Sequence, residues 1–199
     1  MKLLIIGASG TLGRALVDHL AGHHELIKVG KTQGDHQVDI TQSDSVKNLF
    51  EKIGKVDGIL SVTGNLHFAP LAQMTAEDFS LGLNNKLLGQ VNLALIGQHY
   101  LNDGGSITLT SGIVSDQPII GGTNASTVNA AIEGFIRSAA IELKNSQRIN
   151  AVNPSVVTES LDVYGPFFKG YESVSAKRVA MAFQRSIEGG LNGQIFKVW

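Results

Sequence analysis

The stretch Leu3-Leu4-Ile5-Ile6-Gly7-Ala8-Ser9-Gly10-Thr11-Leu12-Gly13 decides the fold of this chain. A short, wholly apolar run predicts a buried strand, and the three glycines directly behind it predict a tight turn into a helix. Gly7 permits the turn, Gly10 lets backbone N–H groups approach a diphosphate, and Gly13 lets the helix pack closely on the strand. The amino end of that helix would offer free N–H groups and the positive end of the helix dipole. The turn therefore predicts a dinucleotide site, although the same glycines would also suit a tight connection that binds nothing.

The composition is that of one globular domain. The chain has 199 residues, 43% of them hydrophobic, and a formal net charge of −1. This length can bury a sizeable core, and the scattered lysines and arginines form no basic patch for nucleic acid or an anionic membrane. The absence of cysteine excludes disulfides, thiolate nucleophiles and cysteine-ligated metals.

Two further absences shape the expected location and chemistry. The apolar run before Gly7 is too short for a secretory signal, and no apolar stretch is long enough to span a membrane, so we expect a cytoplasmic protein. The histidines show no ligand spacing with carboxylate support, so we expect no metal site.

Strand and helix patterns alternate along the chain. Strands are expected at 2–6, 25–29, 37–40, 58–62, 106–110, 149–152 and 193–198, and helices at 11–21, 43–52, 75–101, 126–144 and 175–188. Thr75 and Asp78 resemble a capping box that would begin the long third helix. Such alternation predicts an α/β fold, a three-layer doubly wound parallel sheet (Rossmann fold), in a single domain over residues 1–199.

The segment 154–174 interrupts this alternation. It carries two prolines and four aromatic residues, Tyr164, Phe167, Phe168 and Tyr171. It is too apolar for a solvated linker, so it is predicted to be a lid or substrate-side loop. A packed surface loop is the alternative.

Several motifs, in the same order, resemble those of the short-chain dehydrogenase/reductase family, and the likeness runs nearly end to end. The motifs are the glycine turn, with the spacing of atypical or extended branches; Asp39-Ile40-Thr41, similar to Asp-Val-Thr; Ser61-Val62-Thr63-Gly64, in place of Asn-Asn-Ala-Gly; Ser111, on the catalytic serine; Ala130-Ala131 through Leu143, similar to the helix after the active-site tyrosine; Arg148 through Pro154, similar to Arg-Val-Asn-x-Val-x-Pro-Gly; and Asn192-Gly193-Gln194, similar to Thr-Gly-Gln. Between Val29 and Gln37 there is no room for the family's usual helix. The resemblance therefore implies a trimmed single-domain member.

The resemblance also implies an altered reacting centre, because the family uses an Asn, a Ser and a Tyr-x-x-x-Lys. Aligned on Ala130-Ala131, the tyrosine position falls on Ala125 and the lysine position on Asn129. Aligned on Gly89, the asparagine position falls on Lys86. Lysine and asparagine are thus expected to have exchanged places on two neighbouring helices. An ordinary exposed helix lysine is the alternative for Lys86.

The catalytic residues expected on this basis are Ser111, Lys86 and Asn129. Ser111 would orient the substrate oxygen, unless it only caps a loop, and Lys86 would stabilise developing negative charge. Ala125 carries no proton to donate. Tyr164 from the 154–174 loop, or Lys86 with its pKa lowered by burial, would have to supply it.

The end of the second strand bears on the choice of cofactor. A carboxylate there would bind the ribose diol of NAD, whereas this chain places Lys31 and Thr32, which suit a 2′-phosphate. NADP(H) is therefore favoured, and NAD stays possible because Asp35 lies nearby. The residues expected to contact the cofactor are Gly7, Ser9, Gly10, Thr11, Leu12, Gly13, Lys31, Thr32, Asp39, Ile40, Thr63, Gly64 and Pro154.

Two functional hypotheses follow. The first is a small NADP(H)-dependent oxidoreductase that interconverts a carbonyl and an alcohol. The second is a nucleotide-binding or sensing protein that has lost the chemistry, which the missing tyrosine favours. The resemblance also implies a homodimer or homotetramer joined through the two helices that carry the small residues, with burial of those residues against the sheet as the alternative. The sequence does not identify the substrate.

Overall fold

Seven parallel strands form the middle layer of the molecule, in the order β3-β2-β1-β4-β5-β6-β7. The computed structural model describes residues 1–199 and bounds the strands as β1 (Lys2–Ile6), β2 (Glu25–Gly30), β3 (His36–Gln37), β4 (Val56–Ser61), β5 (Leu101–Thr110), β6 (Arg148–Pro154) and β7 (Ile195–Val198). The chain order reverses between β1 and β4. In open parallel sheets, ligands bind beyond the carboxyl ends of the strands at such a reversal.

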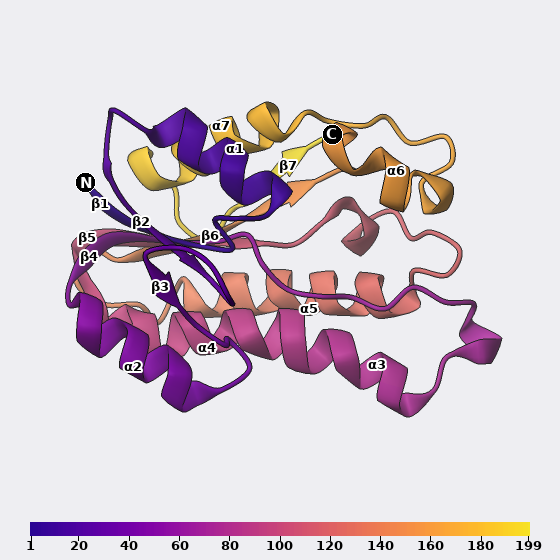
Figure 1. Ribbon diagram of the computed structural model, residues 1–199, viewed down its shortest axis with the longest axis horizontal. Coiled ribbons are helices and arrows are strands. Elements are labelled where there is room, and N and C mark those ends of the chain that lie inside the picture. The colour runs from indigo at the N-terminus through magenta and orange to yellow at the C-terminus, as the bar shows by residue number, and fades with distance from the viewer.

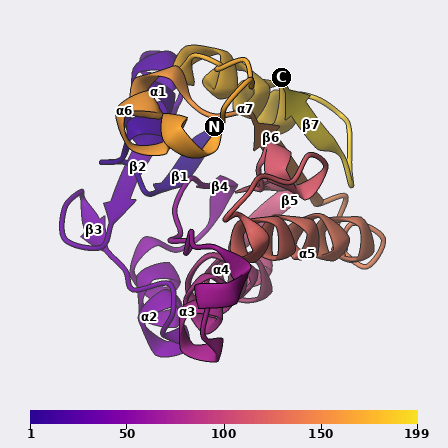
Figure 2. The same ribbon diagram turned by 90° about the vertical axis from the view of Figure 1, so that its right-hand side faces the viewer.

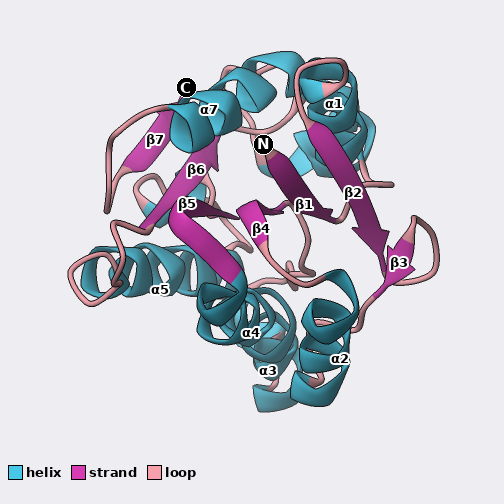
Figure 3. Cartoon of the chain, turned by 90° about the vertical axis from the view of Figure 1, so that its left-hand side faces the viewer, coloured by secondary structure: helices cyan, strands magenta, loops and turns pink.

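Helices cover both faces of the sheet, as predicted. Figure 1 shows α1 (Thr11–Leu20) and α7 (Ala176–Glu188) on one side, and α2 (Ser43–Ile53), α4 (Leu88–Gly97) and α5 (Thr123–Ala139) on the other. Figure 2 shows the end of the molecule that carries the short α6 (Leu161–Tyr164). Figure 3, from the opposite end, shows the strands fanning out between the two helical layers. No helix combines the length and apolar composition needed to cross a membrane.

The alternation of side chains along β1 divides the core between these layers. Leu4 and Ile6 belong to the apolar cluster under α2, α4 and α5, whereas Leu3 and Ile5 belong to the cluster under α1 and α7. All four are at most 1% exposed. A fully buried side chain of this kind contributes about 1.5–3 kcal/mol, so the apolar run that predicted the strand also anchors both layers.

Several predicted boundaries are wrong. The third strand is His36–Gln37 rather than 37–40, so Asp39 and Ile40 lie in the loop behind it. A tight turn joins it to β2, in agreement with the lack of room for a helix. The fifth strand begins at Leu101, where the long helix was expected to end, and the last strand is shorter than expected.

The long third helix is interrupted. It begins at the expected capping box, in which the Thr75 hydroxyl accepts from the Asp78 backbone N–H and the Asp78 carboxylate accepts from that of Thr75. α3 (Ala76–Gly82) then passes through a π-helical turn, Leu83–Leu87, before α4 begins. α4 ends at Gly97 rather than near Leu101, because a 3₁₀ turn, Gln98–Tyr100, closes the helix. Such π turns in helices occur frequently at functional sites.

Two other segments differ from expectation. α5 begins at Thr123, three positions before the predicted Ser126, and ends at Ala139 rather than Lys144. The 154–174 segment contains α6 between two 3₁₀ turns instead of an open loop. The 3₁₀ turns of the chain are Leu71–Gln73, Gln98–Tyr100, Ile113–Ser115, Thr158–Ser160 and Gly165–Phe167.

Candidate active site

Two adjoining cavities lie beyond the carboxyl ends of the central strands. The larger, of about 310 Å³, extends from the glycine turn to α5 and the 154–174 segment. The smaller, of about 180 Å³, lies over the ends of β1 and β2. Thr63, in the loop after β4, lines both. The two cavities therefore meet at this residue.

The glycine turn packs too closely for side chains. A Cβ on Gly7, whose φ is +91°, would lie 2.7 Å from the backbone oxygen of Val62. A Cβ on Gly13 would lie 2.0 Å from the backbone oxygen of Gly7. Gly10 is the N-cap of α1 and supplies no side-chain cap, so the helix keeps free N–H groups at this end. The turn thus fits a diphosphate for the reason given from the sequence: its glycines and the free N–H groups of α1 leave the backbone open to an anion.

The smaller cavity holds an ion pair. Lys31 Nζ lies 3.1 Å from Asp39 Oδ2, with the Lys31 side chain 72% exposed. Asp39 Oδ1 accepts hydrogen bonds from the backbone N–H and hydroxyl of Thr41 at 3.0 and 2.6 Å. The Thr41 bonds and the Lys31 ammonium lower the pKa of Asp39 to about 2. The carboxylate is therefore ionised at neutral pH, and Lys31 offers an exposed cation beside it.

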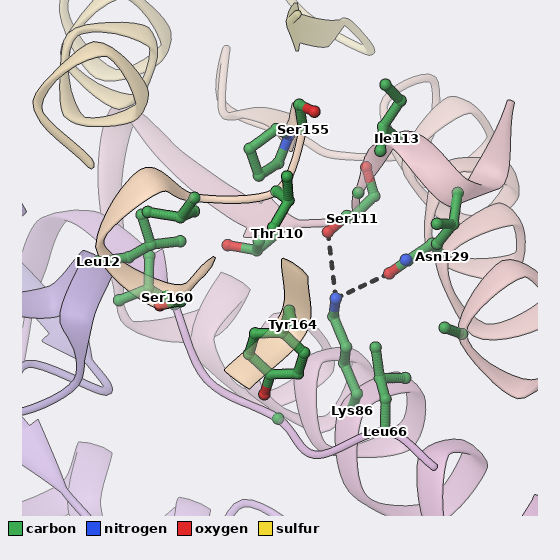
Figure 4. A pocket seen from close by; sticks show the side chains of 18 of the residues that line it. Leu12, Leu66, Lys86, Thr110, Ser111, Ile113, Asn129, Ser155, Ser160 and Tyr164 are labelled. Carbon is green, nitrogen blue, oxygen red and sulfur yellow. Dashed lines mark hydrogen bonds between the residues drawn. The ribbon is translucent and has the colours of Figure 1, made fainter. Parts of the chain in front are cut away.

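Lys86 is the charged group of the larger cavity (Figure 4). The π turn carries it, and its side chain is buried, with the residue 7% exposed. Nζ donates to Asn129 Oδ1 at 2.7 Å and to the Ser111 backbone oxygen at 3.1 Å. An ammonium has three N–H donors, so one remains for a ligand. The expectation that Lys86 and Asn129 are neighbours matches this geometry, and the alternative of an exposed lysine is excluded.

The electrostatic setting of Lys86 is unusual for a lysine. No carboxylate lies within ion-pair distance of Nζ, since the chain's ion pairs all involve other residues. Burial lowers its pKa from the ordinary value of 10.5 to about 8. The group is thus mostly charged at neutral pH and close to losing its proton, which suits a proton donor.

A glycine fixes the position of this lysine. A Cβ on Gly64, whose φ is +123°, would lie 2.6–2.7 Å from the Cα, Cβ and Cγ atoms of Lys86. The loop after β4 can therefore lie directly on the π turn only because residue 64 has no side chain. The predicted cofactor residue Gly64 serves this contact.

The hydroxyl of Ser111 points away from Lys86. It donates to Glu133 Oε1 at 3.1 Å, and the same oxygen accepts from Ser115 and Asn153 at 2.7 and 2.8 Å. Glu133 lies one turn after Asn129 on α5 and is 4% exposed. The Ser111 hydroxyl is therefore not aimed at a substrate, which differs from the predicted role. In this structure the Ser111 backbone carbonyl orients Lys86 instead.

The rest of the larger cavity is mostly apolar. Ala125, which is fully buried, lines it, as do Ile113, Val114 and the aromatic residues Phe68, Tyr164 and Phe168. Phe68 packs against Tyr164, with ring centroids 5.8 Å apart. Aromatic residues of the predicted substrate-side segment thus meet the loop after β4 over the cavity.

The predicted cofactor residues divide into two groups. Those that line a cavity are Gly7, Thr11, Leu12, Lys31, Asp39, Ile40, Thr63, Gly64 and Pro154. Ser9, Gly10 and Gly13 belong to the glycine turn, while Thr32 lies in the exposed β2–β3 turn, where its backbone oxygen accepts from Gln37. The structure does not bring Thr32 to either cavity.

Sequence reasoning missed three polar residues near these cavities. Arg14, in the first turn of α1, donates to the backbone oxygen of Ser9 in the glycine turn. Asn85 lines the smaller cavity and accepts from the Asn65 N–H at 2.7 Å. The third is Glu133. Arg14 could have been predicted, because it is a basic residue directly after the last glycine of the turn. Asn85 and Glu133 have no such local pattern, and only the packing of the folded chain brings them near the cavities.

The parallel sheet, the glycine turn and the paired cavities define a dinucleotide-binding α/β protein. A family model described as Enoyl-(Acyl carrier protein) reductase matches residues 14–187, and the chain belongs to the short-chain dehydrogenase/reductase family. A hydroxynaphthalene reductase of Aspergillus fumigatus is 27% identical over 138 residues, which are 67% of this chain and 50% of that protein. The chain spans about half the length of the curated relatives it matches.

Solved structures resemble the whole chain. The protein lin1944 from Listeria innocua is 46% identical, with a TM-score of 0.98 and complete coverage of both chains. A small-chain dehydrogenase in complex with NADPH is 25% identical, with a TM-score of 0.89, and the match covers 100% of this chain and 96% of that one. The same α/β fold therefore recurs in other proteins of this size.

Proposed function

We propose that the protein is an NADP(H)-dependent oxidoreductase that interconverts a small carbonyl compound and its alcohol. The carrying observation is Lys86, a buried ammonium held by two neutral acceptors, with one N–H left for a ligand in the larger cavity. Family membership, reductases among the relatives and an NADPH-bound structural neighbour support the proposal.

The glycine turn and the two cavities would hold the cofactor. Gly7, Gly10 and Gly13 would receive the diphosphate. Asp39 and Ile40 line the smaller cavity and would hold the adenosine half, and Thr63, Gly64 and Pro154 line the larger cavity and would hold the nicotinamide half. Lys31 would meet the 2′-phosphate, since it is an exposed cation beside the smaller cavity. When bound, the reduced nicotinamide supplies a hydride to the substrate carbon.

Lys86 would carry the proton chemistry. Its free N–H would bind the carbonyl oxygen and stabilise the negative charge that develops there. It would then transfer that proton to the oxygen, which leaves a neutral amine that takes up a proton from water. Asn129 Oδ1 and the Ser111 carbonyl would aim the ammonium throughout, because both accept from it. This arrangement supplies a donor where Ala125 has none.

The rival hypothesis was a binding or sensing protein without turnover. Its support is the aligned position of Ala125, and the names of the relatives do not favour it, because they are reductases. The two hypotheses share the cofactor site and differ only in chemistry.

The assembly and location form part of the proposal. We expect a homodimer or homotetramer joined through α4 and α5, because their outer surface exposes Leu88 and Leu95 together with the small residues Ala130 and Gly134. Gly82, Gly89 and Gly97 do not serve such an interface, since they pack inside the chain. Leu95→Asp should separate the subunits and so lower the molecular mass of the assembly measured by light scattering. We also expect the protein to be located in the cytoplasm.

The experiment is to mix the protein with NADPH and a panel of carbonyl compounds and to follow the absorbance of the reduced cofactor. Turnover that Lys86→Ala abolishes, with NADPH binding retained, is the expected result. Tight NADPH binding without turnover of any carbonyl would favour the sensor. No binding of either reduced dinucleotide would overturn the whole proposal.

A further inference from the structure

The larger cavity carries a single charge. Its lining contains no Asp, Glu, Arg or His, and Lys86 is its only charged residue. The side chains opposite the glycine turn are apolar or aromatic, among them Leu66, Phe68, Ile113 and Phe168. These residues, with Val114 and Ala125, belong to a third apolar cluster that is separate from both layers of the core.

Phe68, Tyr164 and Phe168 line the cavity beside the branched side chains of the third cluster and form an apolar wall with them, and Phe167 and Tyr171 pack behind these rings, outside the lining. Phe68 lies 5.8 Å from Tyr164 and 5.0 Å from Phe167 between ring centroids, and Phe168 meets Tyr171 edge to face at 5.6 Å. A flat apolar ligand gains contact area and ring–ring packing on such a wall. A charged substituent placed there would be desolvated without a partner.

Apart from the glycine turn, which the diphosphate of the cofactor would occupy, the one cation of the cavity is its only strong binder of an anion. Nζ of Lys86 has no carboxylate partner, and its two acceptors, Asn129 Oδ1 and the Ser111 carbonyl, are neutral. A ligand with both an aldehyde and a carboxylate would place the carboxylate at Lys86, since a charged acceptor forms the stronger bond. Its aldehyde would then lie on the apolar wall, away from the group that must bind the reacting oxygen.

We propose that the cavity selects small, uncharged carbonyl compounds with an apolar ring, and that carboxylates of the same size bind at Lys86 as inhibitors rather than substrates. This inference rests on the proposed function and names its substrate class. The cavity volume of about 310 Å³ lies at the lower end of the range of ligand pockets, so it suits one ring beside a nicotinamide.

The first test compares benzaldehyde, para-formylbenzoate and the methyl ester of the latter, with NADPH in excess. The ester is larger than the acid but uncharged, so it separates charge from size. We expect kcat/KM for the acid to be at least about tenfold below both neutral aldehydes. A kcat/KM for the acid equal to or above that of its ester would overturn the inference.

A second cation, placed on the 154–174 segment, should reduce the discrimination against the carboxylate. Ser160 lines the cavity, and its hydroxyl makes no cap bond at the start of α6. Figure 4 shows Ser160 and Asn129 on opposite sides of Lys86. Ser160→Arg should bring the acid to within about threefold of its ester, because the carboxylate then has a partner away from Lys86. The matched control is Val163→Arg, in α6 three residues after Ser160, 59% exposed and outside the cavity, which should leave the ratio unchanged.

Binding supplies a readout that needs no turnover. Benzoate should bind the protein–NADP⁺ complex in calorimetry and compete with benzaldehyde, and Lys86→Met should abolish benzoate binding. Benzyl alcohol should still bind that variant through the apolar wall. Benzoate affinity that is unchanged in Lys86→Met would refute the assignment. Failure to reduce any aldehyde would refute the proposed function alone, because the benzoate result still decides the charge selection.

Discussion

Lys86→Met removes the ammonium and keeps the length and most of the apolar stem of the side chain. If Lys86 donates the proton, the variant loses a positioned general acid, which contributes on the order of 10²–10⁴-fold to rate. We therefore expect kcat to fall by about that factor, with NADPH affinity retained, because the cofactor residues lie on other elements. The matched control is Lys55→Met. Lys55 also donates to two backbone carbonyls, those of His99 and Leu101, but lies outside both cavities.

The same lysine sets the pH dependence. Because burial lowers the Lys86 pKa to about 8, carbonyl reduction should be constant below that pH and fall about tenfold for each further unit above it. Alcohol oxidation needs the neutral amine, so it should rise through the same pH. Stopped-flow traces of the hydride-transfer step in buffers on both sides of pH 8 measure both limbs.

Stability provides an independent measure of the buried charge. The pKa of Lys86 falls from 10.5 in the unfolded chain to about 8 in the folded one, so the unfolded state binds more protons between these values. Stability of the wild type should therefore rise with pH across this window, by about 3 kcal/mol relative to Lys86→Met. Urea denaturation of both proteins at each pH gives the difference. A rate profile that is flat through pH 8, together with near-wild-type kcat in Lys86→Met, would refute the reasoning.

Three further predictions concern other residues. Lys31→Glu should weaken NADPH binding by about tenfold and shift preference toward NADH, because a carboxylate repels the 2′-phosphate; fluorescence titration of both cofactors checks this, and equal loss for both would contradict it. Glu133→Ala should destabilise the fold by about 1–3 kcal/mol in urea, since the buried Ser111 hydroxyl loses its acceptor and Ser115 and Asn153 lose their shortest hydrogen bonds, whereas the exposed Glu142→Ala should change little. Gly13→Ala should abolish cofactor binding or folding, because its Cβ would lie 2.0 Å from a backbone oxygen; Gly190→Ala, with open space around its Cβ, should leave cofactor binding and thermal melts unchanged.

The glycine turn shows why most of the fold could be predicted. The apolar run 3–6 and the glycines behind it encode a strand, a turn and a helix through local rules that need no distant partner. The errors fall where distant packing decides. The long helix becomes π-helical at Leu83–Leu87, where Lys86 lies against Gly64, a residue from another loop. No local pattern distinguishes that turn from ordinary helix.

The candidate site divides in the same way. Lys86 and Asn129 could be named from the sequence because each lies at a fixed spacing from a residue that resembles a family motif, Lys86 from Gly89 and Asn129 from Ala130-Ala131. The direction of the Ser111 hydroxyl could not be predicted, because it is set by a hydrogen bond to Glu133. That residue lies on another element, one turn after Asn129 on α5. Hydrogen bonds between side chains on different elements depend on distances that only the packed chain sets.

The sequence by itself determined a parallel α/β sheet and a glycine turn between its first strand and first helix, because strand burial and glycine geometry act within a few residues. Only the tertiary structure decided that Lys86 is buried without a counter-ion, with its pKa lowered to about 8, at the end of an apolar cavity. Desolvation has no local signature. It arises when α5, the loop after β4 and the 154–174 segment close around one ammonium and exclude the water that would otherwise solvate it.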